Sequence, residues 1–229
     1  MSLREHSIYD CIINNARNYS DEIALVSGDL RLTYAEVPSH VNSLARGLLN
    51  TGFEKGDRIG VLLNNCAEYA LLLAACTRIG LITVCLNTRT SSDEMRKILE
   101  QAKPKALIFQ KSYEQQADEL RDLHIHRQLY CIDEASILSS SFDQLLDEDP
   151  SALTEPQPAI DDGWLIIPTA AVDGIPKGAL LSQRNVMASA DVHLHHFGRE
   201  TIKGHLVALP IFHVMGLTSA WATFISGGK

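Results

Sequence analysis

The chain has 229 residues, of which 45% are hydrophobic and 21% charged, and its 20 basic and 28 acidic side chains give a formal net charge of -8 at pH 7. So large an apolar fraction excludes an intrinsically disordered chain, and only 14 glycines and 8 prolines exclude collagen-like or other low-complexity structure. These values fit one large domain or two small ones.

The negative charge is concentrated in one part of the sequence. The window from Glu114 to Asp162 contains 13 acidic residues and only two basic ones, Arg121 and Arg127, so it carries -11 and leaves +3 on the remainder. We therefore expect no nucleic-acid partner, whereas the slightly basic remainder leaves the binding of small anions open.

The five cysteines form no Cys-x-x-Cys pair. An odd count in a chain large enough to build a core predicts buried free thiols, which suit a reducing cytoplasm. The N-terminus lacks the apolar core of a signal peptide, and no run approaches the ~20 apolar residues that span a bilayer. A cytoplasmic protein with no transmembrane segment is therefore predicted.

The first third of the sequence predicts strands and helices in alternation. Residues 23–34 read as two strands around a turn at Ser27-Gly28-Asp29. Thr33 and Glu36 form a capping-box pattern before an amphipathic helix that Gly52 ends. A buried strand is predicted at 58–63. Asn65 with Glu68 then predicts the start of a helix that is apolar nearly all round.

The same alternation continues beyond residue 80. We predict strands at 81–86, 106–110 and 129–132, a helix from Ser91 to about Gln101 with a Ser91/Glu94 capping box, and a helix around 114–123. This order predicts an α/β fold with mostly parallel β-sheet flanked by helices and right-handed crossovers.

The stretch from Ser139 to Asp162 is rich in Ser, Asp, Glu and Pro and reads as a surface linker. It predicts a first α/β sub-domain over 1–160 and the start of a second over 161–229. In the second part we expect strands at 163–167 and 206–209 and helices at 184–195 and 216–225.

The segment from Leu165 to Asn185 is the first candidate site. A predicted strand ends in a loop that carries Gly174, Lys177 and Gly178 before a further strand and helix. Glycines let backbone N–H groups turn toward a polyphosphate, and a lysine supplies the compensating charge. It is not the Walker pattern, because no Gly-Lys-Ser/Thr opens a helix. An ordinary surface turn is the alternative.

The segment from Leu206 to Gly216 is the second candidate site. Its predicted strand would deliver Phe212 and His213 to the carboxyl edge of the sheet, where open α/β sheets bind ligands. His213 could contact a charged ligand and Gly216 could make room for it. The alternative is a hydrogen-bonded histidine at a strand end.

Together these segments resemble a known family. The motifs are Leu32-Thr-Tyr-Ala-Glu36, Gly56-Asp-Arg-Ile-Gly60, Leu86-Asn87, Pro176-Lys-Gly178 and Leu209-Pro-Ile-Phe-His-Val-Met-Gly216. In this order they resemble the N-terminal landmarks of the adenylate-forming superfamily, which includes acyl-CoA synthetases, peptide-synthetase adenylation domains and luciferases. The resemblance runs from about Ser7 to the last residue.

The resemblance implies an AMP-forming acid-CoA ligase. ATP and a carboxylic acid, fatty or aryl, would give an acyl-adenylate and pyrophosphate, and the acyl group would pass to coenzyme A, with Mg²⁺ neutralising phosphate charge. Carried over by motif position, the phosphate-loop residues are Thr169, Asp173, Gly174, Lys177 and Gly178. By the same comparison Phe212 and Gly216 belong to the substrate pocket and His213 is catalytic.

The loop departs from the family pattern. The family reads Thr-Ser-Gly-Thr-Thr-Gly where this chain has Thr169-Ala-Ala-Val-Asp-Gly174. Three hydroxyl donors and one glycine are missing, and the Asp173 carboxylate stands where a phosphate would come. Two like charges ~4 Å apart repel by roughly 1 kcal/mol in water and about 4 kcal/mol at an effective dielectric constant of 20. We therefore expect weak phosphate binding unless Mg²⁺ bridges Asp173 to the phosphates.

The chain is also much shorter than complete members of the family. Nothing in it matches the family's Tyr-Gly-x-Thr-Glu segment, its ribose-binding aspartate or its C-terminal lysine domain. The expectation is an N-terminal fragment of a larger ligase that is inactive without the remainder of its own chain. A homodimer is an additional expectation.

Three other readings compete with this one. His193 and His196 lie three residues apart on a predicted helix, but no further ligand is evident and we predict no metal site. The altered loop favours a degenerate, non-catalytic relative that acts as a scaffold, whereas the intact Pro176-Lys-Gly178 and Phe212-His213 argue against it. A nicotinamide-binding domain lacks the required Gly-x-Gly-x-x-Gly after a strand.

Overall fold

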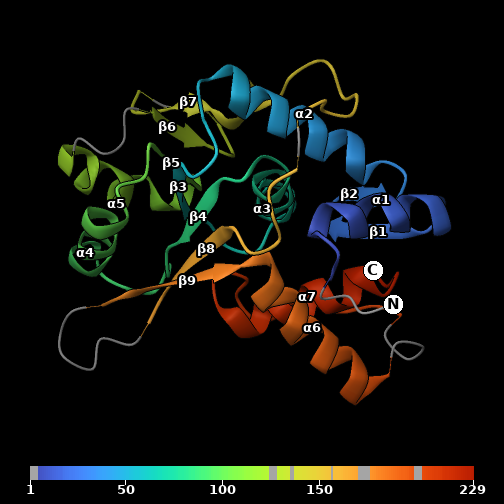
Figure 1. Cartoon of the computed structure of the whole chain (residues 1–229). Coiled ribbons are helices and arrows are strands. Elements are labelled where there is room, and N and C mark those ends of the chain that lie inside the picture. The colour runs from blue at the N-terminus through green and yellow to red at the C-terminus, as the bar shows by residue number, and fades with distance from the viewer. Residues whose placement is uncertain (1–4, 124–127, 135–136, 156, 170–175, 199–202) are drawn as a thin grey trace.

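The computed structural model describes residues 5–123, 128–134, 137–155, 157–169, 176–198 and 203–229 (Figure 1). In chain order the helices and strands are α1 (Ile8–Asn18), β1 (Ile23–Ser27), β2 (Leu30–Thr33), α2 (Val37–Asn50), β3 (Arg58–Leu62), α3 (Ala67–Ile79), β4 (Ile82–Cys85), α4 (Ser92–Ala102), β5 (Ala106–Phe109), α5 (Glu114–Glu119), β6 (Gln128–Cys131), β7 (Ser140–Ser141), β8 (Gly163–Pro168), β9 (Gly178–Ser182), α6 (Gln183–Phe197) and α7 (Val214–Ile225).

A seven-stranded sheet in the order β7-β6-β5-β3-β4-β8-β9 forms the centre of the molecule. Neighbouring strands are parallel except β8 and β9, which are antiparallel. The strands β1 and β2 form a separate antiparallel pair. The predicted α/β class with a mostly parallel sheet is therefore confirmed.

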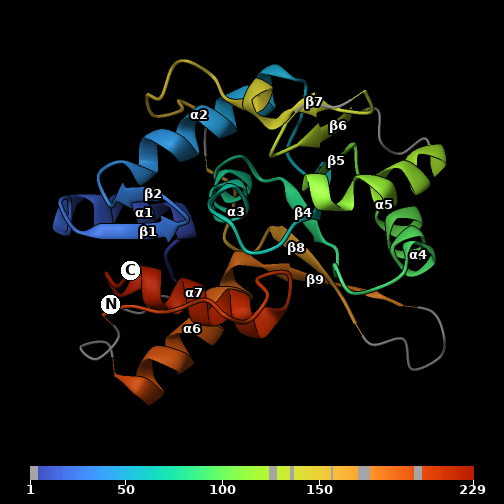
Figure 2. The same ribbon diagram turned by 180° about the vertical axis from the view of Figure 1, so that it is seen from behind.

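The strand order reverses at β3. From β3 the chain passes through α3 to β4 on one side, and α4 then returns it to β5 on the other side of β3. The helices α4 and α5 consequently cover one face of the sheet, and α2 and α3 cover the other (Figures 1 and 2). Because β3, β4, β5, β6 and β8 are parallel, their carboxyl ends meet at one edge, where open α/β sheets bind ligands.

The helix α3 is the most deeply buried helix of this arrangement. Its Tyr69 and Leu72 have no exposed surface, which agrees with the apolar run that surrounds the whole helix. It ends at Gly80, whose φ of 76° is the left-handed conformation that glycine adopts without strain. The indole N–H of Trp164 donates to the Leu73 carbonyl at 3.1 Å and so ties β8 to α3.

Two of the predicted helix caps differ from the structure, whereas the Ser91/Glu94 capping box of α4 is confirmed. The helix α2 begins at Val37, after the predicted Thr33/Glu36 box, and Pro38 lies in its first turn. Glu36 accepts hydrogen bonds from the N–H and the hydroxyl of Thr33, but Thr33 caps no helix. The residue that caps α3 is Cys66 rather than Asn65.

The strand predicted at 206–209 was wrong. Among the described residues no strand pairs with this segment, and the side chain of Leu206 is 88% exposed. The carbonyls of Val207 and Leu209 accept hydrogen bonds from the Asn65 side chain instead. By contrast, the helix α1 was not expected, although Ser7 and Asp10 form a complete capping box at its start.

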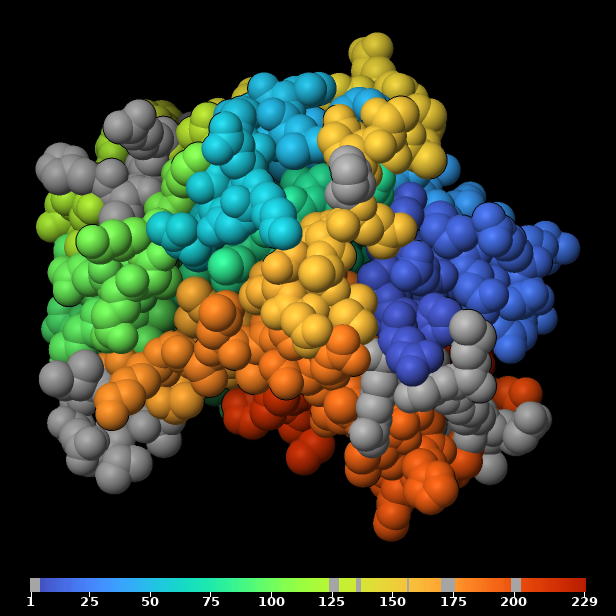
Figure 3. Space-filling view, viewed as in Figure 1, coloured from blue at the N-terminus to red at the C-terminus, as the bar shows by residue number. Residues whose placement is uncertain are grey.

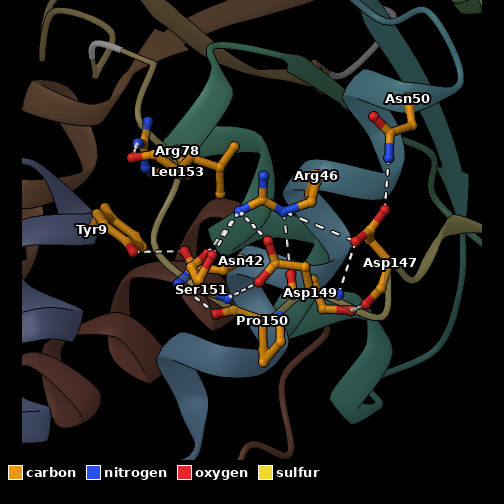
Figure 4. A network of polar contacts seen from close by, with 11 residues as sticks. Tyr9, Asn42, Arg46, Asn50, Arg78, Asp147, Asp149, Pro150, Ser151 and Leu153 are labelled. Carbon is orange, nitrogen blue, oxygen red and sulfur yellow. Dashed lines mark hydrogen bonds and ion pairs between the residues drawn. The ribbon is translucent and has the colours of Figure 1, made fainter.

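Residues 147–155, which we call the strap, lie within the predicted linker and bind to α2 and α3 (Figure 4). Arg46 of α2 contacts Asp149 at 3.4 Å, and the Ser43 hydroxyl donates to the Asp147 carbonyl at 2.6 Å. Arg78 of α3 donates to the carbonyls of Leu153 and Glu155 at 2.7 and 2.9 Å. Figure 3 shows this segment in gold, running over the surface beside α2 and the N-terminal residues.

Strands from both sides of residue 160 belong to the same sheet, because β8 pairs with β4. The division into sub-domains at residue 160 stays a prediction. All five cysteines are free, four of them buried and Cys66 partly buried, so the prediction of free thiols is confirmed. Among the described helices, none is both long and apolar enough to cross a membrane.

Candidate functional site

The loop between β8 and β9 has a closed neck. The N–H and the hydroxyl of Thr169 both donate to the carbonyl of Lys177, at 2.8 and 3.1 Å. Two further contacts fix the same place: the Gln101 side chain at the end of α4 donates to the Pro176 carbonyl at 3.1 Å, and Gly178 pairs with Pro168 in the β8–β9 ladder. The neck is therefore held by hydrogen bonds within the loop and by one hydrogen bond from the end of α4, a helix that covers one face of the sheet.

Gly178 is required by packing inside this neck. A Cβ at Gly178 would lie 2.5 Å from Cγ2 of Ile166, far inside van der Waals contact. The absence of a side chain at Gly178 lets β9 approach β8 closely. The sequence had instead explained this glycine by the approach of its backbone to a phosphate, and the assignment of Gly178 to phosphate binding stays a prediction.

Lys177 is exposed at the neck, and no carboxylate among the described residues pairs with it. An unpaired ammonium at the carboxyl end of a sheet is suited to an anionic ligand. Asp173 and Gly174, the other two predicted loop residues, lie outside the described residues. Of the residues predicted to bind phosphate, the structure brings three together in the neck: Thr169, Lys177 and Gly178.

The second predicted group lies at the start of α7. His213 is the N-cap residue, and its Nδ1 accepts a hydrogen bond from the N–H of Met215 at 3.4 Å. A ring that accepts at Nδ1 carries its proton on Nε2 when neutral, so the exposed imidazole presents an N–H donor. Among the described residues no hydrogen bond or ion pair joins this group to the loop neck.

Phe212 and Gly216 lie beside His213. Phe212 is 7% exposed and belongs to the main hydrophobic core. A Cβ at Gly216 would lie 2.3 Å from the carbonyl oxygen of Pro210, so the first turn of α7 packs directly on that backbone. The room that Gly216 makes is taken by Pro210, and a place for either residue in a substrate pocket stays a prediction.

The structure adds two residues that sequence reasoning missed. Asn65 binds the segment that precedes Phe212, and Gln101 binds the segment that precedes Lys177. Asn65 lies three residues after the end of β3, a buried strand, near the carboxyl edge where open α/β sheets bind ligands, and that position was a usable signal. Gln101 offered none, because only the tertiary fold places the end of α4 beside the loop.

A cavity of about 810 Å³ lies between the β1–β2 hairpin, α3, α7 and residues 204–211. Its lining is largely apolar, with Arg31, His205 and Lys229 as the basic members, and its volume is in the range of small-molecule sites. Cys66 lines it, but burial raises the pKa of that thiol to about 12, so the thiol is not a nucleophile near pH 7. The lining includes Ile211 and Leu217 but not Phe212, His213 or Gly216.

Within the part of the chain that the structure describes, no group of three or more His, Cys, Asp or Glu side chains is placed to hold a metal ion. The predicted-helix pair His193 and His196 lies on α6, where both rings contact Phe197.

An α/β sheet with a lysine-bearing loop at its carboxyl edge is the architecture of the α/β domains that bind small molecules at that edge. Residues 13–229 match the family model described as AMP-binding enzyme, and the chain therefore belongs to that family.

The curated relatives are CoA ligases. The chain is 30% identical over 200 residues to the indoleacetate–CoA ligase of Aromatoleum aromaticum, covering 86% of this chain and 39% of the relative. It is 28% identical over 197 residues to the 2-succinylbenzoate–CoA ligase of Oceanobacillus iheyensis, covering 86% and 38%. The chain thus spans about two fifths of the length of these relatives.

Solved structures agree with the family. A Rhodopseudomonas palustris structure named as a long-chain-fatty-acid CoA ligase superposes with a TM-score of 0.90 at 29% identity, over 99% of this chain and 57% of that one. The inhibitor-bound N-terminal domain of FACL13 from Mycobacterium tuberculosis gives a TM-score of 0.85 at 25% identity, over 97% and 56%. The fold is that of the N-terminal domain of adenylate-forming ligases.

Proposed function

We propose that this chain supplies the N-terminal part of an AMP-forming carboxylic acid–CoA ligase. The enzyme would convert ATP and a fatty or aryl acid to an acyl-adenylate and pyrophosphate, and then transfer the acyl group to coenzyme A. Membership in the AMP-binding enzyme family and the CoA-ligase relatives support the reaction class. The single observation that carries it is the closed β8–β9 neck with Lys177 exposed and unpaired among the described residues.

In this proposal Lys177 offsets negative charge on the ATP phosphates. Thr169 and Gly178 fix the neck from which the loop with Asp173 and Gly174 extends. Preorganised charge of this kind contributes to catalysis because it costs no reorganisation when the phosphate charge shifts.

His213 donates from Nε2 to the carboxylate or the adenylate as the two reactants meet, and it is the proposed catalytic residue. Its Nδ1 is engaged by the Met215 N–H, which fixes the tautomer that this role needs. Phe212 and Gly216 are proposed to border the acid beside it. The acid is the small-molecule partner of the site.

Mg²⁺ and coenzyme A are proposed for the complete enzyme. The metal would neutralise phosphate charge, and coenzyme A would supply the acceptor thiol. In this proposal no step of the chain's own residues is assigned to the metal. A cytoplasmic location, a homodimer and the need for further chain to complete the active site belong to the same proposal.

The loop composition supports one alternative. With Asp173 in place of a hydroxyl donor, the chain could belong to a non-catalytic relative that acts as a scaffold. The two functions differ in whether any acid is activated.

Pyrophosphate release separates them. The complete polypeptide that carries this chain is assayed with ATP over fatty, aryl and short acids, with Lys177→Ala as the matched variant. We expect turnover with at least one acid, a large loss on Lys177→Ala, and no turnover by residues 1–229 alone. Absence of turnover with every acid would support the scaffold.

A further inference from the structure

We propose that Asn65 is a positioning residue for the segment that carries Phe212 and His213, and that its side-chain amide holds the backbone of this segment in place by hydrogen bonds. The effect of Asn65 on catalysis rests on the proposed function, whereas its effect on the local structure is independent of that function.

The carboxamide of Asn65 makes three hydrogen bonds to one stretch of backbone 142 to 146 residues further along the chain. Its Nδ2 donates to the carbonyls of Val207 and Leu209, both at 2.9 Å. Its Oδ1 accepts from the N–H of Ile211 at 2.9 Å. One side chain thus uses both its donor hydrogens and its acceptor on a single segment.

A local bend in the segment lets one amide reach all three partners. Residue 209 lies in a bend, and the N–H of Ala208 donates to the Leu206 carbonyl at 2.8 Å, so the backbone is not extended here and two of its carbonyls lie near the same Nδ2. A neighbouring strand would satisfy those groups with peptide N–H and C=O. Asn65 satisfies them with a primary amide, which carries the same groups on a side chain.

Asn65 is attached to a buried part of the fold. It lies between β3 and α3, and Leu63 and Ala67, two positions before and two positions after it, have at most 1% exposed surface. Residues 203–213, by contrast, contain no helix or strand. The three hydrogen bonds therefore attach residues 207–211, which pair with no strand among the described residues, to the segment that follows β3.

The opposite side of the segment is held by α7. Gly216 packs against the carbonyls of Leu209 and Pro210, and the His213 N–H donates to the Pro210 carbonyl at 3.1 Å. His213 follows Ile211 by two residues, so a shift of the segment moves the imidazole as well. The contacts of Asn65 on one side of the segment and of Gly216 on the other therefore fix the position of His213.

Asn64 provides a matched control. It is also exposed and also follows β3, but it bonds to Gln110 and Tyr113 and makes no hydrogen bond to residues 203–213. Asn65→Leu keeps the size of the side chain and removes every polar group. Asn65→Gln keeps both polar groups on a longer stem and serves as the conservative variant.

Amide hydrogen exchange on residues 1–229 tests the structural part. We expect the Ile211 amide to exchange about tenfold faster or more in Asn65→Leu, with partial protection restored in Asn65→Gln and no change in Asn64→Leu. Unchanged exchange at Ile211 in Asn65→Leu would overturn the inference. If Asn65→Leu does not fold, judged by its tryptophan fluorescence, Asn65→Ser is compared in the same way.

Kinetics in the complete polypeptide test the catalytic part. We expect Asn65→Leu to lower kcat about tenfold with little change in KM for ATP, and to lower it far less when His213→Ala is already present. Equal effects in both backgrounds would show that Asn65 does not act through His213. If the wild type turns over no acid, the proposed function fails, and the exchange experiment alone decides the inference.

Discussion

The backbone N–H and the hydroxyl of Thr169 converge on the carbonyl oxygen of Lys177, eight residues later. These two hydrogen bonds to one acceptor close the loop between β8 and β9 at its base. The Lys177 side chain therefore extends from backbone that is already fixed. A hydroxyl used in this way is not free to donate to a ligand in the same conformation. The contribution of Thr169 is therefore the shape of the neck.

Replacement of Asp173 tests the charge of the loop. We expect Asp173→Thr to tighten ATP binding by about fivefold or more in the complete polypeptide, because it removes a repulsion of roughly 1 kcal/mol even at full solvent screening. Isothermal titration calorimetry measures the dissociation constant. Asp173→Asn, which removes the charge without adding the hydroxyl, separates the two effects. An unchanged or weaker affinity in Asp173→Thr would contradict the charge argument.

Replacement of Gly178 tests the packing of β9 on β8. We expect Gly178→Ala to lower the free energy of unfolding by about 1–3 kcal/mol, because its Cβ would meet Ile166 Cγ2 at 2.5 Å. Gly163→Ala is the control in the same strand pair, since its Cβ meets the end of the flexible, half-exposed Leu180 side chain, which can move aside. Urea denaturation gives both values.

A double-mutant cycle completes that test. Ile166→Ala removes the clashing methyl group, so Gly178→Ala should cost less in its presence. Additive effects would show that the Ile166 contact does not explain the glycine.

The strap contains two arginine contacts that differ in burial. Arg78 is 3% exposed, lies over the Tyr9 ring and donates to two strap carbonyls, whereas Arg46 makes its contacts at the surface. Removing Arg78 leaves those carbonyls without their partner, so Arg78→Ala should cost on the order of 2–3 kcal/mol. Arg46→Ala should cost about 1 kcal/mol or less.

Limited proteolysis provides the local measurement for the strap. Cleavage within residues 147–155 should increase strongly in Arg78→Ala and weakly in Arg46→Ala. Equal protease sensitivity in the two variants would argue against Arg78 as the main anchor.

The pH dependence of stability has a defined contribution from His193. Burial, followed by the charges of His205 and His196, lowers the pKa of its imidazole below the ordinary value of 6.5. The unfolded chain then binds the proton more readily than the fold does, so this contribution to stability is present above pH 6.5 and is lost as the pH falls toward the lowered pKa.

The measurement is the free energy of unfolding between pH 7.5 and pH 5. Its decrease toward acid should be smaller in His193→Gln than in the wild type. His195→Gln controls for the loss of a ring on the same helix. An identical pH dependence in His193→Gln and the wild type would exclude the contribution.

Local patterns predicted most of the elements because the forces that form them act between near neighbours. Ser91 and Glu94 cap α4 through their own backbone, and the apolar run of α3 requires burial wherever the helix lies. The motifs around Pro176 and Phe212 were sufficient to indicate the family. The cap at Asn65 was misread because a short polar side chain before a helix can bind either that helix or a distant backbone.

The sequence by itself determined the α/β class, the alternation of strands and helices, the free thiols and the two segments in which charged and glycine residues are concentrated. Only the tertiary structure decided that residues 206–209 form no strand, that Gly178 and Gly216 accommodate Ile166 and Pro210, and that Asn65 and Gln101 hold the two candidate segments. These facts join residues 75 to 146 positions apart or depend on close approaches of a few ångströms. No local pattern contains such distances, because they are set by how the whole chain packs.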